Sequence, residues 1–344
     1  MNVKPWSGGD ADRWDRFVRR QADGTFFHLT GWKTVIERTY GFAADYFYAE
    51  EDGEVAGVLP LFHVRRPFAG SALISVPFGV YGGVLAASEA AQQALLARAR
   101  DRAAQLGAGY VEFKSIRRQF EDLPTRADLY VTFRQELDPD PEVNLERIPR
   151  KTRRMVRVSL KNGLEAEVTR AGLSDFYEIY AASVHRLGTP VFPRFLFTSL
   201  LQTFPKDCFF LFVRHGGRRV GGVLTFAFRD TLLPYYGGAL REFNHLAVNN
   251  FMYWQLMEHG RQTGYRWFDF GRSKRNAASG SYDFKRHWGM QEVGLEYQYY
   301  LRPGVPLPDV NSANPRYQFL VSAWKKLPLP LTKILGPRLV RYFP

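Results

Sequence analysis

The chain repeats an ordered series of signals, and this repeat limits the folds that it can adopt. A Tyr-Gly-Gly triplet stands at 81–83 and again at 236–238, 155 residues further on. Around each triplet, strand-like segments precede a helical segment, and a further strand-like segment follows it. Self-similarity at one fixed offset indicates a duplicated structural unit. The sequence therefore predicts two similar domains.

The corresponding segments occur in the same order in both halves. In the first half, two strands, a helix and a strand are predicted over 53–62, 77–86, 90–107 and 109–114. In the second half, the same series is predicted over 218–228, 233–242, 246–264 and 265–270. Each half opens with two segments whose apolar residues recur at spacings of three and four, which is typical of amphipathic helices. This order predicts an α/β fold with mixed sheets.

A stretch rich in Asp and Pro, ELDPDPEVNLER (136–147), marks the junction between the halves. We therefore expect a first domain over 1–140 and a second over 166–302. Between them we expect a basic linker helix over 141–165. The remaining residues, 303–344, predict a basic amphipathic tail, which either docks on the body or contacts a membrane surface.

The charge of the chain favours polyanionic partners. Lys and Arg number 47 against 34 Asp and Glu, which gives a net charge of +13. Residues 147–161 contain seven basic residues and no acid, and no acid follows Asp309. Nucleic acid, anionic lipid headgroups and phosphorylated substrates all suit such surfaces, although a basic run can also be a solvated helix face. If the run is helical, one face carries a phosphate-binding stripe, and the predicted polyanion-binding residues are Arg150, Arg153, Arg154, Arg157 and Lys161.

Several classes of protein and site are disfavoured. The single Cys208 excludes an internal disulfide framework and is expected to fill the core. No HExxH, HxxxH or CxxC spacing occurs, so we expect no metal. GxSxG, P-loop and GxGxxG motifs are also missing. With no apolar run of about 18 residues and a polar N-terminal stretch, we expect a cytoplasmic protein, with peripheral contact at the inner face of the membrane as an option.

The stretch WFDFGRSK (267–274) is the first candidate site. Asp269 lies within an aromatic strand, where an unpaired carboxylate costs several kcal/mol. Gly271 allows a sharp turn, and donors follow at the C-terminal end of the strand, where open α/β sheets tend to bind ligands. These predicted substrate-binding residues are Arg272, Ser273 and Lys274.

Two further stretches offer polar groups. In HRLGTPVFPR, Arg186 and Thr189 could present a guanidinium and backbone donors to a phosphate or carboxylate, or could simply form a turn. In PYYGG, the hydroxyls of Tyr235 and Tyr236 could face an acceptor, with close approach permitted by the two glycines. The alternative for both tyrosines is burial in a strand.

Five stretches together resemble the FemAB family, and most closely its branch associated with exosortase and PEP-CTERM systems: LGTPVFPR, PYYGG, NNFMYW, FDFGRSK and FKRHWG. The resemblance covers nearly the whole chain, including the tail. It implies two tandem domains of the GNAT acyltransferase fold and transfer of an acyl group to an amine. In characterised members, an amino acid moves from aminoacyl-tRNA to a peptidoglycan precursor.

The same resemblance assigns roles to particular residues. Lys285 matches the family lysine that contacts aminoacyl-tRNA and stabilises developing charge, and Phe284 matches its neighbour. An amine attacking an ester forms a tetrahedral oxyanion, so the site needs a hydrogen-bond donor and a route for a proton. Asp269 is expected to orient the amine or to pair with Arg272 or Lys285. Lys285 and Asp269 are thus the predicted catalytic residues.

The expected donor follows from a missing motif. GNAT enzymes that use acyl-CoA hold its pyrophosphate on a glycine-rich turn at a helix N-terminus. The corresponding stretch here, REFNHLAVNNFMYW (241–254), contains no glycine. We therefore expect no bound cofactor, with aminoacyl-tRNA as the donor and an amine-bearing envelope or polysaccharide precursor as the acceptor. The alternatives are an acyl-CoA-dependent N-acetyltransferase and a non-catalytic binding protein of the exosortase or exopolysaccharide system.

Overall fold

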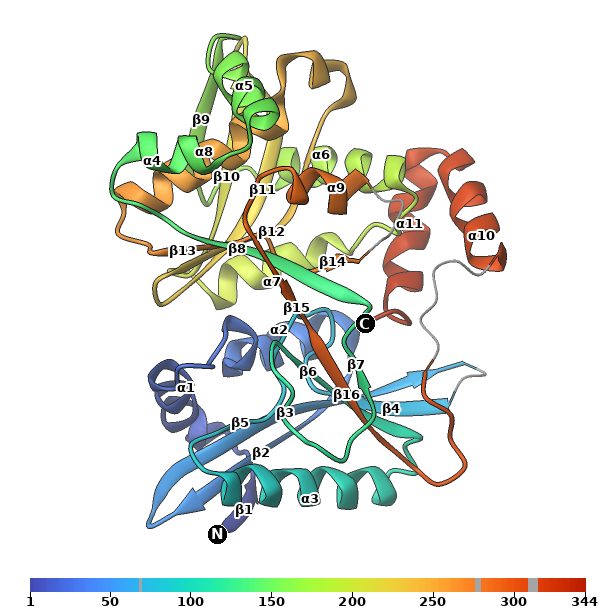
Figure 1. Ribbon diagram of the computed structural model, residues 1–344. Coiled ribbons are helices and arrows are strands. Elements are labelled where there is room, and N and C mark those ends of the chain that lie inside the picture. The colour runs from blue at the N-terminus through green and yellow to red at the C-terminus, as the bar shows by residue number, and fades with distance from the viewer. Residues whose placement is uncertain (68–69, 276–279, 309–314) are drawn as a thin grey trace. The chain divides into compact units, whose positions relative to one another are not determined.

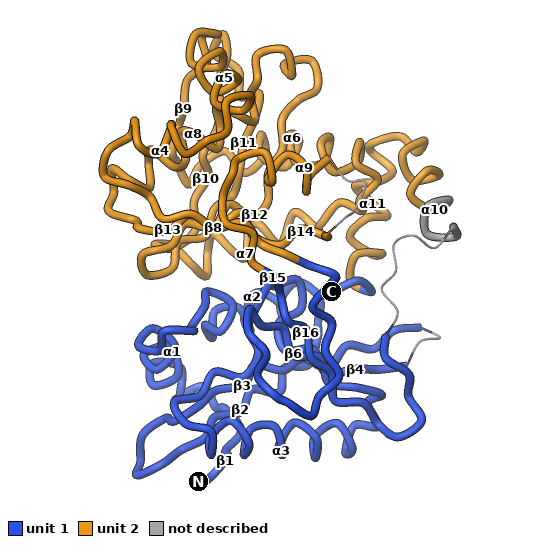
Figure 2. The backbone as a smooth tube through the Cα atoms, viewed as in Figure 1, with its two compact units in different colours: residues 1–130, 294–310, 342–344 blue, residues 131–293, 311–341 orange. Residues whose placement is uncertain are grey.

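The computed structural model of the chain describes residues 1–67, 70–275, 280–308 and 315–344, and consists of two compact units (Figures 1 and 2). The first unit comprises 1–130, 294–310 and 342–344. The second comprises 131–293 and 311–341. Each unit is built around one mixed sheet with helices packed on it, so the predicted α/β class is confirmed.

The first unit carries a sheet of order β1-β2-β3-β4-β6-β16-β7, with β5 paired to β3. Only β4 and β6 pair in parallel among the strand pairs described for this sheet. Its strands are β1 (Asn2–Pro5), β2 (Ala43–Glu51), β3 (Glu54–Arg66), β4 (Gly70–Ile74), β5 (Leu85–Ala86), β6 (Tyr110–Ser115), β7 (Thr125–Arg126) and β16 (Glu296–Leu301). Its helices are α1 (Ala11–Arg20), α2 (Thr30–Tyr40) and α3 (Glu89–Gln105).

The second unit carries a sheet of order β14-β8-β13-β12-β11-β10-β9, with β15 paired to β8. Its strands are β8 (Tyr130–Glu136), β9 (Leu164–Thr169), β10 (Cys208–His215), β11 (Arg218–Phe228), β12 (Thr231–Ala239), β13 (Trp267–Asp269), β14 (Ser273–Lys274) and β15 (Gln291–Gly294). Its helices are α4 (Pro141–Arg147), α5 (Arg150–Ser159), α6 (Leu173–Leu187), α7 (Arg194–Thr203), α8 (Val248–Gln262), α9 (Gly280–Arg286), α10 (Pro315–Lys326) and α11 (Leu329–Val340).

The repeat seen in the sequence is a repeat in topology. In the first unit, α3 connects the parallel strands β4 and β6, and in the second, α8 connects the parallel strands β12 and β13. A helix is the usual way to join parallel neighbours, because the chain must cross from one end of the sheet to the other. The apolar faces of both helices pack on their own sheets, which places the two main cores.

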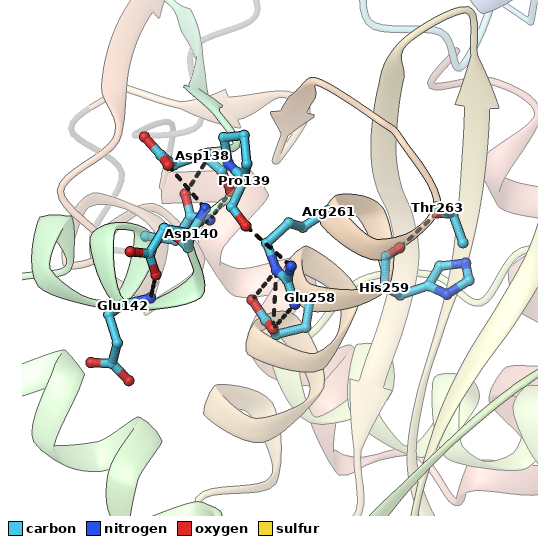
Figure 3. A network of polar contacts seen from close by, with 9 residues as sticks. Asp138, Pro139, Asp140, Glu142, Glu258, His259, Arg261 and Thr263 are labelled. Carbon is cyan, nitrogen blue, oxygen red and sulfur yellow. Dashed lines mark hydrogen bonds and ion pairs between the residues drawn. The ribbon is translucent and has the colours of Figure 1, made fainter.

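Helix α8 is also tied to the segment that enters α4 (Figure 3). Asp140 caps α4 by accepting a hydrogen bond from the backbone N–H of Glu142 at 2.9 Å. Arg261, near the end of α8, donates to the carbonyl of Pro139 at 3.1 Å and pairs with Glu258. The Asp- and Pro-rich junction expected between the domains therefore forms the N-terminus of α4, which hydrogen bonds hold in place within the second unit.

One predicted strand does not form. Residues 77–84 are a loop, and only Leu85 and Ala86 pair with β3, whereas the second Tyr-Gly-Gly triplet lies within β12. The loop carbonyls are bound by side chains instead: the Tyr297 hydroxyl donates to Val80 O at 2.7 Å, and the Thr25 hydroxyl donates to Tyr81 O at 3.1 Å. With its carbonyls bound in this way, the segment needs no strand partner.

The predicted domain boundaries differ from the compact units because the halves exchange a strand. Strand β8, from the end of the first half, lies in the second sheet, where it pairs with β13. Strand β16, from the end of the second half, lies in the first sheet, where it pairs with β6. The predicted first domain therefore ends ten residues after 130, where the first segment of the first unit ends. The predicted second domain ends nine residues after 293, where the first segment of the second unit ends.

The expected linker helix and most of the expected tail belong to the second unit, whereas 303–308 and 342–344 belong to the first. Helices α4 and α5 occupy most of 141–165, and α10 and α11 pack against α6. Trp324 of α10 is buried. Across the described ranges, no helix combines the length and apolar composition that a membrane span requires.

Candidate active site

The candidate site is centred on the C-terminal end of β13. Asp269 is completely buried, and Phe268 and Phe270 on either side of it pack edge to face in the core. Its Oδ1 accepts hydrogen bonds from the hydroxyl of Thr132 and from the backbone N–H of Gly271, the latter at 2.8 Å. Its Oδ2 lies 3.3 Å from Nε of Arg134. The carboxylate therefore has both hydrogen bonds and a counter-charge, as a buried ion requires.

Sequence reasoning missed Thr132 and Arg134. Both lie on β8, and Arg134 is the direct cross-strand neighbour of Asp269. The guanidinium of Arg134 also lies over the ring of Trp267, 5.3 Å from its centroid. The polar residues at 132 and 134 alternate with the buried Val131 and Phe133, which is a signal of a one-sided strand. That signal does not say which sheet the strand joins.

Lys285 closes the turn that follows β13. Its ammonium donates to the carbonyl oxygens of Phe270, Gly271 and Arg272 at 2.7, 3.1 and 3.3 Å. Gly271 has φ of +67°, a conformation that side-chain-bearing residues rarely adopt, and this turn aims the three carbonyls at one point. Burial lowers the pKa of Lys285 to about 8, against the opposing effect of the charge on Asp269.

The three residues after Gly271 have different environments. Ser273 is buried in β14, and within the described parts of the chain its hydroxyl makes no hydrogen bond. Lys274 is partly buried, and its pKa is lowered by burial and by the charge of Arg272. The ring of Phe284 lies tilted to that of Tyr253 and edge to face with that of Trp288, with centroid distances of 5.5 and 6.2 Å. Phe284 therefore packs against the core beside Lys285.

The tyrosines of β12 belong to a second group of residues. Tyr236 is buried among aromatic rings that include Tyr180 of α6 and Phe197 of α7, and Tyr235 is partly buried beside it. A Cβ at Gly238 would collide with Ser183 of α6. Gly238 therefore allows α6 to approach β12 closely. Sequence reasoning expected an acceptor, and not a helix, in this position.

Arg186 and Thr189 lie at the end of α6. The backbone N–H of Gly188 donates to His185 O at 2.9 Å, and that of Thr189 donates to Val184 O at 3.0 Å. These bonds form a helix C-cap with Gly188 in the left-handed region, so both N–H groups expected to bind an anion are already used. The side chain of Arg186 is partly exposed and Thr189 is exposed.

A third group of residues lies on α5, which forms within the basic run as predicted. Its inner face, including the buried Val156, packs against α8. Its outer face has a hollow of about 340 Å³ lined by Val158 and by all five predicted cations: Arg150, Arg153, Arg154, Arg157 and Lys161. Arg153 donates to the carbonyl of Glu146, and the side chains of the other four form no ion pair with any described residue. The hollow, hereafter the α5 basic hollow, is thus positively charged, and no residue that the structure describes neutralises it by an ion pair.

The structure thus brings Asp269, Gly271, Arg272 and Lys285 together, with Ser273, Lys274 and Phe284 adjacent in sequence. Tyr235 and Tyr236 on β12, and Arg186 and Thr189 at the end of α6, belong to neighbouring elements of the same unit. In the part of the chain that the structure describes, no three His, Cys, Asp or Glu side chains gather as a metal site would require.

Comparison with known proteins defines the class of fold. Residues 145–286 match the model of the acetyltransferase (GNAT) domain. The structure resembles FemX, with a TM-score of 0.70 and 17% identity over 93% of this chain and 100% of that chain. It also resembles a tandem GNAT protein from the clavulanic acid biosynthesis pathway (TM-score 0.54, 14% identity, 90% and 99% of the two chains). L-PGS from Bacillus licheniformis is similar as well (TM-score 0.53, 14% identity, 90% and 96%). No curated protein matches the chain.

These comparisons confirm the predicted fold of two GNAT-like units in tandem. The matched GNAT domain contains β13, Lys285 and the α5 basic hollow. A GNAT domain within a FemX-like fold supports acyltransferase chemistry. The link to the exosortase-associated branch stays a prediction.

Proposed function

We propose that the chain is a FemAB-like N-acyltransferase that moves an aminoacyl group from tRNA to an amine acceptor in cell-envelope or exopolysaccharide-related metabolism. The match of residues 145–286 to the GNAT domain supports transfer of an acyl group to an amine. The choice of a tRNA-linked donor is carried by one observation, the α5 basic hollow. It concentrates five cations on the matched domain without an acid among its lining residues.

The α5 basic hollow suits a ligand with several phosphates. Each phosphate bound by Lys or Arg releases counterions, so a cluster of such residues gives strong binding that depends on salt. A tRNA backbone provides a line of phosphates that can follow the helix, and a lipid-linked pyrophosphate provides two. Arginine is well suited to both, because its planar guanidinium can bind two phosphate oxygens at once.

The turn before α8 also favours tRNA over CoA. The residue that precedes the helix and takes the left-handed conformation is Ala247, with φ of +58°. No glycine lies between Gly238 and Gly260, so the glycine-rich phosphate nest is absent from this turn. The helix start offers the side chains of Asn249 and Asn250, which are partly exposed.

In the proposed reaction, the acceptor nitrogen forms a bond to the ester carbonyl carbon, and the bond from that carbon to the tRNA oxygen breaks. The proton lost by the amine ends on the leaving hydroxyl, so no redox partner is needed. Lys285 is proposed to stabilise the oxyanion of the intermediate. Its three protons bind three carbonyls in this structure, so it must exchange one bond, for which the longest, to Arg272 O at 3.3 Å, is the candidate.

An acyl-CoA donor is the second candidate. It is favoured by the match of residues 145–286 to the acetyltransferase (GNAT) domain. The acceptor nitrogen would again form a bond to the carbonyl carbon. The bond that breaks would instead be the carbon–sulfur bond of a thioester, and the proton lost by the amine would end on the CoA thiol.

The test supplies each donor separately. Purified protein is incubated with labelled aminoacyl-tRNA or with labelled acetyl-CoA, together with amine acceptors fractionated from cell extract. We expect transfer from aminoacyl-tRNA, its loss in Lys285→Ala, and its retention in Lys206→Ala, which removes an exposed lysine of the same unit. Transfer from acetyl-CoA alone would establish the second candidate. Transfer from neither donor by folded protein would favour the non-catalytic alternative.

A further inference from the structure

Helix α11 turns its large aliphatic residues away from the body of the protein. Leu331, Ile334 and Leu339 are 39, 59 and 40% exposed, and Leu335 is partly exposed. Residues 331, 334 and 335 share one face of a helix because they are three and four apart, and Leu339 continues it four residues after 335. A helix of a globular protein normally turns such a stripe toward the core.

The inward face of α11 consists of smaller residues. Thr332, Gly336 and Val340 are buried where α11 packs in the second unit, beside α6 in Figure 1. A Cβ at Gly336 would lie 2.6 Å from the carbonyl oxygen of Val191, so the helix and this backbone segment are in close contact. Helix α11 therefore cannot rotate about its axis to bury its large aliphatic residues, because these residues do not fit against Val191.

A polar contact fixes the same orientation. Lys333 pairs with Glu178 of α6, and its ammonium lies 5.9 Å from the centroid of the Tyr177 ring. Leu187 and Phe195, which flank Val191 in the chain, are also about half exposed, at 52 and 49%.

The charged residues of α10 and α11 are all basic, and Glu178 of α6, which borders α11, is paired with Lys333. Lys325, Lys326, Arg338 and Arg341 are exposed, and no acidic residue follows Asp309 in the chain. A protein partner of ordinary composition does not require a cationic rim. An anionic lipid surface does, because it attracts Lys and Arg and accepts aliphatic side chains at the level of its headgroups.

We propose that the outward face of α11, formed by Leu331, Ile334, Leu335 and Leu339 with its flanking cations, docks on the surface of an anionic membrane. The aliphatic side chains insert between headgroups, and Arg338, Arg341, Lys325 and Lys326 contact the lipid phosphates. The contact is peripheral, because the helix lies along the surface. It brings the acyltransferase unit to a surface where lipid-linked acceptors reside.

The first measurement is sedimentation of the full-length protein with phosphatidylglycerol-containing vesicles and with pure phosphatidylcholine vesicles. We expect binding to the anionic vesicles that weakens with salt. The double variant Leu331→Glu/Ile334→Glu should lower it by about tenfold or more, since aliphatic groups are removed and like charges are added. The control is Val168→Glu on β9, whose parent side chain is similarly exposed at 44%; it should bind as the parent does.

The second measurement reports insertion at one position. The only cysteine, Cys208, is buried, so Ile334→Cys can be labelled selectively with a polarity-sensitive fluorophore. Its emission should shift to the blue with anionic vesicles, whereas a label on Val168→Cys should not respond. Unchanged sedimentation of the double variant together with an unshifted label would overturn the proposal, because the α5 basic hollow is intact in every variant. A change in molar mass by light scattering, without a change in vesicle binding, would assign the face to a second copy of the chain and would also overturn it.

Discussion

Asp269 shows how one buried charge links the stability of the second unit to its candidate site. Its carboxylate accepts from Thr132 and from the Gly271 N–H, and it pairs with Arg134 at 3.3 Å. The bond to Gly271 shapes the turn whose carbonyls Lys285 binds. Asp269 therefore acts as a positioning residue for this turn, and loss of its charge should affect both stability and activity.

We expect Asp269→Ala to lower the free energy of unfolding by about 2 to 4 kcal/mol, because the partly buried Arg134 loses its counter-charge. Asp269→Asn, which keeps the acceptor oxygen, should cost less. Chemical denaturation checks both variants, with Glu165→Ala on exposed β9 as the control that stays within about 0.5 kcal/mol of the parent. Parental stability and activity in Asp269→Ala would show that this carboxylate is neither part of the site nor a support for it.

Lys285 predicts a pH dependence of transfer. Its pKa of about 8 means that it carries the proton below pH 8 and loses it above. If the ammonium stabilises the oxyanion, kcat/KM should fall as the pH rises through about 8. Lys285→Ala should lower turnover by about two to three orders of magnitude. It should also destabilise the fold by about 1 to 3 kcal/mol, because three carbonyls lose their donor.

The discriminating variant is Lys285→Arg. A guanidinium stays charged throughout this range, so any residual activity should no longer fall near pH 8. Full pH profiles of transfer provide the measurement, with Lys206→Arg as the control that leaves the profile unchanged. An alkaline limb that is identical in the parent and in Lys285→Arg would assign the titration to another group.

At the scale of single elements, α5 combines two roles on opposite faces. The face with Val156 packs on α8, and the face with the five cations is exposed to solvent. A helix face that is merely hydrated can carry both acids and bases, because residues of mixed charge are hydrated equally well and also pair with each other. A face with only cations is not needed for hydration. The arrangement favours a polyanion as the partner of this face.

The triple variant Arg150→Ala/Arg154→Ala/Arg157→Ala should therefore weaken tRNA binding. It should reduce the slope of log affinity against log salt by about one unit for each phosphate that the variant no longer binds. The matched control removes three exposed arginines of α1 and α2 in the first unit, Arg16, Arg20 and Arg38, and so changes the net charge equally. Binding and slope that respond alike to both triple variants would show that only the overall charge matters.

For the whole molecule, the exchange of β8 and β16 is the feature that decides how the chain divides. The two exchanged strands occupy equivalent places: β16 pairs with β6 as β8 pairs with β13. Lys114, 155 residues before Asp269, is also buried, and it lies opposite Tyr297 of the exchanged strand. The duplicated units thus keep a charged residue at the same position, with opposite sign.

This exchange predicts which fragments fold. Residues 1–140 alone lack β16 and should remain unfolded, because Tyr297 and Tyr299 are missing from the core. Residues 1–130 joined to 294–308 by a short glycine-rich linker should fold, since Tyr130 O accepts from Leu295 N at 3.0 Å and the ends are adjacent. Circular dichroism and thermal unfolding of both fragments test this; a cooperative transition for 1–140 would contradict it.

Local patterns in the sequence were sufficient to predict the duplication, the helix and the following strand of each crossover, and the mixed α/β class. These features follow from local periodicity, which side-chain burial imposes on each element separately. The helix within the basic run could be predicted for the same reason, because the spacing of Arg150, Arg154 and Arg157 depends only on local geometry. Asp269 could be singled out because a carboxylate among aromatic residues needs a compensating group wherever it lies.

The tertiary structure was needed to identify the group that compensates the charge of Asp269 and to establish which strands form. Arg134 reaches Asp269 because β8 crosses into the second sheet, and strand pairing over such a separation has no local signature. The two Tyr-Gly-Gly triplets adopt different structures for a similar reason: one is paired within β12, whereas distant side chains such as Tyr297 bind the carbonyls of the other. The outward face of α11 depends on Gly336 contacting Val191 and on Lys333 pairing with Glu178, because such contacts with other elements determine which side of an aliphatic helix is buried.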